Sequence, residues 1–135
     1  MLPIVDKERH KIGLKKLHSM GDKAVTAITK DLASISPDIA RYAVEATCGD
    51  IYSRPGLASS NREMIAIAAL TVLGHSLPQL KIHVDAALKN GVTKKEVEEI
   101  IIQMSVYAGW PVAFNAMAAA NEVFEEIAKE ASVSK

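Results

Sequence analysis

The chain has 135 residues, enough for one domain with a buried core, and its 16 basic and 16 acidic residues cancel. A zero net charge argues against a dedicated nucleic-acid-binding protein, which needs a basic excess to neutralise phosphates. Hydrophobic residues make up 49% of the chain but aromatic residues only 4%, so the core must be built from Ala, Ile, Leu, Val and Met, a composition that favours closely packed helices.

The first part of the chain has the pattern of three helices. The first covers about residues 6–20, with Gly21 as its stop, and the second covers about residues 22–34. Ser36 and Pro37 have the pattern of an N-cap followed by a proline in the first turn, which predicts a third helix that Gly49 ends.

A loop is predicted over residues 50–57, because this segment lacks helical periodicity. Arg54 precedes a proline and should therefore be extended. Ser60 and Glu63 then have the spacing of a capping box. The residues that follow, 64–73, are apolar on every side, which predicts a central, buried helix ended by Gly74.

Three more helices complete the pattern. One starts at residues 76–79 and runs to about Asn90, and a second opens with the capping box Thr93 and Glu96. The apolar positions of this second helix follow the helical period through Val97, Ile100, Ile101, Met104 and Tyr107. The last helix follows a break at residues 109–111 and reaches about Lys129. The short turns predict antiparallel neighbours, so the chain is predicted to be all-α, with residues 1–135 in a single domain.

Chemically useful side chains gather at the ends of the most apolar helix. Glu63 stands at its start, and Gln79 and His83 share one face of the following helix. In an antiparallel hairpin, Glu63 and His83 would lie within about 6 Å of each other along the axis. A carboxylate and an imidazole beside an apolar cavity are suited to acid–base catalysis.

Each of these residues also has a structural interpretation. Glu63 fits the reciprocal half of a capping box, and His83 fits a hydrogen-bonded core or interface histidine. Arg62 fits an ion pair with a neighbouring acid, and His10 and His18 fit the exposed face of the first helix.

Several other classes of site lack their motifs. No HExxH pattern predicts a metal site, and no GxGxxG or phosphate-loop pattern predicts a nucleotide cofactor. The single cysteine, Cys48, excludes an intrachain disulfide and has no CxxC partner. The N-terminus has charges where a secretory signal would be apolar, and no run approaches the roughly 18 residues of a membrane span. We therefore expect a cytoplasmic protein without metal, membrane or nucleic acid as a partner.

Five elements in register resemble the carboxymuconolactone decarboxylase family. They begin with residues 49–57, which read G-D-I-Y-S-R-P-G-L, and continue with residues 61–65. Residues 79–83, residues 87–93 with Glu96 and Glu99, and residues 107–111 with Ala113 complete the series, so the resemblance covers nearly the whole chain.

The resemblance implies an all-α fold shared with the alkyl hydroperoxidase D proteins, a helical domain with a central antiparallel helical hairpin. Subunits of these proteins commonly assemble as trimers or hexamers. It implies cofactor-free decarboxylation of 4-carboxymuconolactone to 3-oxoadipate enol-lactone in aromatic-acid degradation. The hydroperoxidase branch has a CxxC motif where this chain has residues 76–79, so thiol peroxidase chemistry is disfavoured. The glutamate and histidine of that branch correspond to Glu63 and His83.

This resemblance suggests a role for each candidate residue. His83 would donate the proton, with Glu63 orienting it. Arg54 is the first choice for clamping a substrate carboxylate and Arg62 the second, because a guanidinium meets a carboxylate with two parallel hydrogen bonds. The remaining candidates for contact with the substrate are Gln79, Tyr107 and Trp110.

Two other functions fit the same residues. One is a lactone isomerase or small-acid hydrolase of the same fold, because one fold serves several reactions. The other is a non-catalytic helical homo-oligomer that binds a ligand or a partner. A redox role for Cys48 is a third, weaker alternative.

Overall fold

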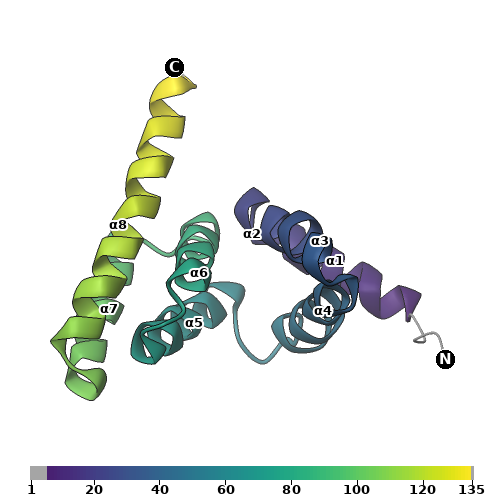
Figure 1. Cartoon of the computed structure of the whole chain (residues 1–135), viewed down its shortest axis with the longest axis horizontal. Helices are drawn as coiled ribbons and strands as arrows, with labels where there is room; N and C mark the ends of the chain where they lie inside the picture. The colour runs from purple at the N-terminus through teal and green to yellow at the C-terminus, as the bar shows by residue number, and fades with distance from the viewer. Residues whose placement is uncertain (1–5, 135) are drawn as a thin grey trace. The chain divides into compact units, whose positions relative to one another are not determined.

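The computed structural model describes residues 6–134 (Figure 1). These residues form helices joined by short connections and contain no strand, which confirms the all-α fold class. Contacts divide the chain into two compact units, Met1–Ser59 and Ser60–Lys135, and each is described by itself. The single domain expected from the sequence stays a prediction. Within residues 6–134, no helix is both long and apolar enough to cross a membrane.

Over its described residues, 6–59, the first unit contains four α-helices and two π-helical segments, which we label η. In chain order these are α1 (Lys7–Ser19), α2 (Asp22–Thr26), η1 (Ala27–Leu32), α3 (Ala33–Ile35), α4 (Pro37–Tyr42) and η2 (Ala43–Tyr52). Side-chain caps set the starts of two helices: Asp6 accepts from the backbone N–H of Arg9, and Ser36 accepts from that of Ile39. The start predicted at Ser36 and Pro37 is therefore confirmed.

Glycines allow α1 and η2 to pack closely. A Cβ atom at Gly13 would clash with the backbone carbonyl of Val44, and one at Gly49 would lie 3.0 Å from the carbonyl oxygen of Arg9. Only glycine permits such an approach of two backbones. Gly49 therefore serves helix packing rather than termination, and the helix continues to Tyr52. The prediction that Gly49 ends the helix, and that the loop starts at residue 50, is wrong for this reason.

The part of the second unit that the structure describes, up to residue 134, contains four α-helices. The boundary between the units falls at the start of the first of them; the four are α5 (Ser59–Leu73), α6 (Leu77–Lys89), α7 (Lys94–Ala108) and α8 (Trp110–Val133). The capping box of α7 is confirmed, with Thr93 and Glu96 each accepting from the other's backbone N–H at 3.1 Å. The predicted cap of α5 is wrong, because the helix already begins at Ser59 and Ser60 lies inside it.

Small residues on α8 hold the core of this unit together. Ala113, Ala116 and Ala120 are buried and form one face of the helix. Helices α6 and α7 pack on α8, which is the long green-to-yellow helix in Figure 1. Val84 from α6 and Val97 from α7 belong to the same buried cluster.

Only one stripe of α5 is buried. Glu63, Ile67 and Thr71 are buried at successive turns, whereas Ile65 is 56% exposed and Leu73 is 55% exposed. The prediction that this helix is buried on every side is therefore wrong for the chain described.

Candidate active site

The buried stripe of α5 and one face of α6 bring Glu63 and His83 together. The Nδ1 atom of His83 lies 2.7 Å from Oε2 of Glu63. Glu63 is 2% exposed and the His83 side chain 20% exposed, so the carboxylate is shielded from water while part of the imidazole stays accessible.

Local sequence explains why the two residues meet. Gly74 ends α5 with a φ of +76°, a conformation that favours glycine, and the chain then turns into α6. Counted from this connection at about 1.5 Å per residue, Glu63 and His83 lie at levels that differ by about 6 Å. The hydrogen bond joins α5 to α6 near this level, and the central antiparallel hairpin stays a prediction. Leu80 and Val84, on either side of His83, anchor α6 in the core.

The hydrogen bond assigns different roles to the two imidazole nitrogens. With Glu63 ionised, Nδ1 must carry the proton that it donates to the carboxylate. In this geometry Nδ1, and not Nε2, faces the carboxylate. A buried carboxylate bonded to an imidazole combines two residue types that general acid–base catalysis uses.

Two further candidates lie next to the pair in the sequence. Arg62 precedes Glu63 on α5 and is partly buried, with its Nε atom shielded from solvent. Gln79 lies one helical turn before His83 on α6 and is exposed. Both belong to the unit that contains the pair, and their contact with a substrate stays a prediction.

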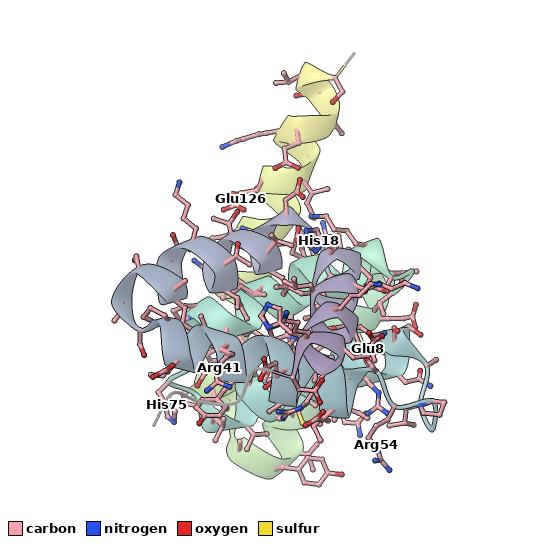
Figure 2. The ribbon with its side chains drawn as sticks, turned by 90° about the vertical axis from the view of Figure 1, so that its right-hand side faces the viewer. Glu8, His18, Arg41, Arg54, His75 and Glu126 are labelled. Carbon is pink, nitrogen blue, oxygen red and sulfur yellow. The ribbon has the colours of Figure 1, made fainter. Side chains whose placement is uncertain are left out.

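Arg54 is exposed in the connection between η2 and α5 (Figure 2). Its backbone N–H donates to the carbonyl of Ile51 at 3.1 Å, which closes the turn after η2. Arg54 belongs to the first unit and the Glu63–His83 pair to the second. Its role as a carboxylate clamp therefore stays a prediction.

Tyr107 and Trp110 flank the turn between α7 and α8. Tyr107 is 71% exposed and Trp110 is 55% exposed. The helical periodicity that grouped Tyr107 with the core residues of α7 therefore fails in the last turn of this helix. The ring of Trp110 stacks on that of Phe114, with centroids 6.0 Å apart. A role for either residue in lining a substrate site stays a prediction.

Sequence reasoning missed a second buried glutamate. Glu45 of η2 is fully buried, and the Nδ1 atom of His10 lies 3.2 Å from its Oε1 atom. The prediction that His10 only occupies the exposed face of α1 is wrong, because that part of α1 packs on η2. The spacing of Arg41 and Glu45, one helical turn apart, was the available signal for an ion pair, and the two side chains do pair at 3.3 Å.

Cys48 is buried in η2. Its burial disfavours the redox alternative, since reactive thiolates need exposure and an electropositive environment.

Sequence comparisons find relatives across most of the chain. A model of the carboxymuconolactone decarboxylase family matches residues 37–122. The chain is 36% identical over 123 residues to 4-carboxymuconolactone decarboxylase of Acinetobacter baylyi, which covers 90% of this chain and 91% of that protein. It is 35% identical over 96 residues to an uncharacterized 15.0 kDa protein of Paracoccus denitrificans, covering 70% and 72% of the two chains. It is 32% identical over 69 residues to nitrosuccinic acid decarboxylase of Metarhizium robertsii, covering 51% and 48%.

Proposed function

The chain belongs to the carboxymuconolactone decarboxylase family, and on that premise we propose that it is a carboxy-lyase acting on 4-carboxymuconolactone or a related small carboxylated lactone. The observation that carries this proposal is the contact of 2.7 Å between His83 Nδ1 and the buried Glu63. Two relatives named as decarboxylases support it, since the substrates in their names are small carboxylic acids.

In the proposed reaction the protein must supply a proton. It need not supply a group that accepts electrons, because the substrate contains one. The bond between the lactone ring and its carboxylate breaks, carbon dioxide leaves, and the electron pair moves into conjugation with the lactone carbonyl. The enolate then forms a carbon–hydrogen bond with the proton on Nε2 of His83. Neutral His83, still bonded to Glu63 through Nδ1, takes its next proton from water. The lactone carbonyl accepts the electron pair, so this step requires no cofactor.

Binding of the substrate requires positive charge, because the lactone carries two carboxylates. We assign the clamp to Arg54 first and to Arg62 second, since a guanidinium can hold a carboxylate with two hydrogen bonds. Gln79, Tyr107 and Trp110 are the proposed remaining contacts. Helical position supports Gln79, because it lies one turn from His83 on α6.

We also propose that the protein is a homo-oligomer. Support comes from apolar side chains left exposed around the α7–α8 turn, such as Val106 at 77% and Phe114 at 64%. Large exposed apolar patches mark interaction surfaces more often than free surface. Light scattering should give the mass of a trimer or hexamer, and the mass of a single chain would contradict this part of the proposal.

The function is tested by assaying the purified protein on 4-carboxymuconolactone beside a panel of related lactones and small acids. We expect release of carbon dioxide from 4-carboxymuconolactone or a close analogue. Isomerisation or hydrolysis of a panel member without carbon dioxide would favour another enzyme of the same fold. Binding of a lactone without turnover would favour a non-catalytic role, and either result would overturn the proposed reaction.

A further inference from the structure

The turn between α7 and α8 carries half of the aromatic residues of the chain. The sequence contains one Trp, three Tyr and two Phe, and one of each falls within residues 107–114. Tyr107 is 71% exposed, Trp110 is 55% exposed and Phe114 is 64% exposed. A chain with so few aromatic side chains would be expected to bury them in its core. Their exposure indicates that another surface covers them.

Aliphatic side chains extend this aromatic region along α7. Val106 is 77% exposed, and Ile102, one helical turn earlier, is 41% exposed. Helix α7 packs on α8, and the exposed residues lie toward the end of this helix pair where the chain turns (Figure 1). We call the five residues the turn surface; they are Ile102, Val106, Tyr107, Trp110 and Phe114.

The turn surface contains no charged side chain. Between Glu99 and Glu122 the sequence has no Asp, Glu, Lys or Arg, although 24% of the chain is charged. The cores of protein–protein interfaces are depleted of charge and enriched in Trp, Tyr and Phe. Helices that lie on lipid headgroups instead carry Lys and Arg beside their apolar face. The composition therefore indicates a protein partner and disfavours a membrane surface.

The lack of charge also indicates which protein is the partner. A partner of different sequence is commonly selected by complementary charge, which the turn surface does not offer. The same surface of a second copy has matching apolar chemistry. At roughly 150–250 Å² per aromatic side chain, the exposed parts of the three rings come to about 400 Å², half of the roughly 800 Å² that each partner buries in a standard interface. Ile102 and Val106 add to this area.

We propose that the turn surface packs against the same surface of a second copy of this chain. The inference rests on the homo-oligomer proposed above and names its interface. Because both chains use the same surface, the contact is closed and joins chains in pairs. The number of chains is then even, so we expect the hexamer rather than the trimer. Tyr107 and Trp110 belong to this surface, so their proposed contact with the substrate would take place beside the boundary between two subunits.

Opposite charges introduced at Val106 test the proposal. Because this side chain is 77% exposed, Val106→Lys and Val106→Glu should leave the folded chain intact, which circular dichroism checks. Each variant alone buries an unpaired charge in the contact, so light scattering should give about half the wild-type mass or less. An equimolar mixture should form heavier particles than either variant alone, because opposite charges then meet across the contact.

Ile35→Lys is the matched control. Ile35 is 81% exposed on α3, in the first unit, so this variant should keep the wild-type mass. A second measurement needs no substitution, because Trp110 is the only tryptophan of the chain. Dilution of the wild type until it dissociates should shift the emission of Trp110 to longer wavelength, as its ring passes from an interface to water.

A wild type with the mass of a trimer or of a single chain would overturn the proposal. Wild-type mass in both Val106 variants would also overturn it, as would an emission of Trp110 that does not change on dissociation. These readouts are mass and fluorescence, so the result is separate from whether the protein decarboxylates a lactone.

Discussion

Each of the two buried glutamates contacts the Nδ1 atom of a histidine, yet their surroundings differ. Glu45 lies among His10, Arg41 and Arg9, whose Nη1 atom is 3.6 Å away. Glu63 contacts His83 at 2.7 Å. A buried carboxylate compensated by several cations is suited to holding a fold together, and one bonded to an imidazole is suited to moving a proton. This difference is why we assign the chemistry to Glu63.

Asp50 gives the first unit a pH-dependent contribution to stability. The Arg9 guanidinium donates to both carboxylate oxygens, with its Nε atom 2.8 Å from Oδ1, and this hydrogen bonding lowers the pKa of Asp50 below its usual value. A lowered folded-state pKa contributes stability that is present above the usual value, about pH 4, and is lost as pH falls through the lowered one. Asp50→Asn should therefore be less stable than the wild type at pH 7, and the difference should shrink below about pH 4.

Denaturant unfolding of the wild type and Asp50→Asn across this pH range measures the effect. In an Arg9→Gln background the same substitution should have little effect, because the partner is gone. A difference in unfolding free energy that stays constant from pH 7 to pH 3 would contradict the ion-pair account.

At the scale of elements, the contact of α1 with η2 depends on Gly13. A methyl group there would clash with the carbonyl of Val44. Overpacking a tight contact of this kind typically costs about 1–3 kcal/mol, more than the roughly 1 kcal/mol by which alanine favours a helix over glycine. We therefore expect Gly13→Ala to lower the free energy of unfolding.

Gly56→Ala is the matched control, since a Cβ atom there meets nothing within 4 Å. Its unfolding free energy should stay within about 0.5 kcal/mol of the wild type. If Gly13→Ala were as stable as Gly56→Ala in urea denaturation, the close packing of α1 on η2 would not be important for stability.

The helix bounds were predictable where local signals set them. Ser36 with Pro37, and Thr93 with Glu96, are caps whose hydrogen bonds involve only neighbours in sequence. The continuation past Gly49 was not predictable, because that glycine serves a contact with α1 that is distant in sequence. The π-helical form of η1 and η2 also has no local signature in these residues.

The candidate site was also predictable in part, because part of it depends on features that are local in the sequence. The meeting of Glu63 and His83 follows from helix rise and a short connection, both of which the sequence contains. Burial of Glu45 depends on the packing of α1 on η2, so nothing in its neighbours indicated it. The exposure of Tyr107 reflects the end of the packed face of α7, which periodicity alone does not locate.

At the scale of the whole molecule, the family match spans parts of both compact units. It begins at residue 37 and ends at residue 122, so it includes Arg54, Glu63 and His83 but not His10. The proposed catalytic residues thus lie within the matched region. We expect them to be shared among relatives.

The central claim is that His83, held by Glu63, supplies the proton, and steady-state kinetics of His83→Ala beside His75→Ala test it most directly. His75 is exposed after α5 and controls for loss of a histidine. On whichever small acid the wild type decarboxylates, His83→Ala should lower kcat by about 10²–10⁴-fold with the oligomer mass unchanged, and His75→Ala should match the wild type. Wild-type kcat in a folded His83→Ala protein would contradict the account.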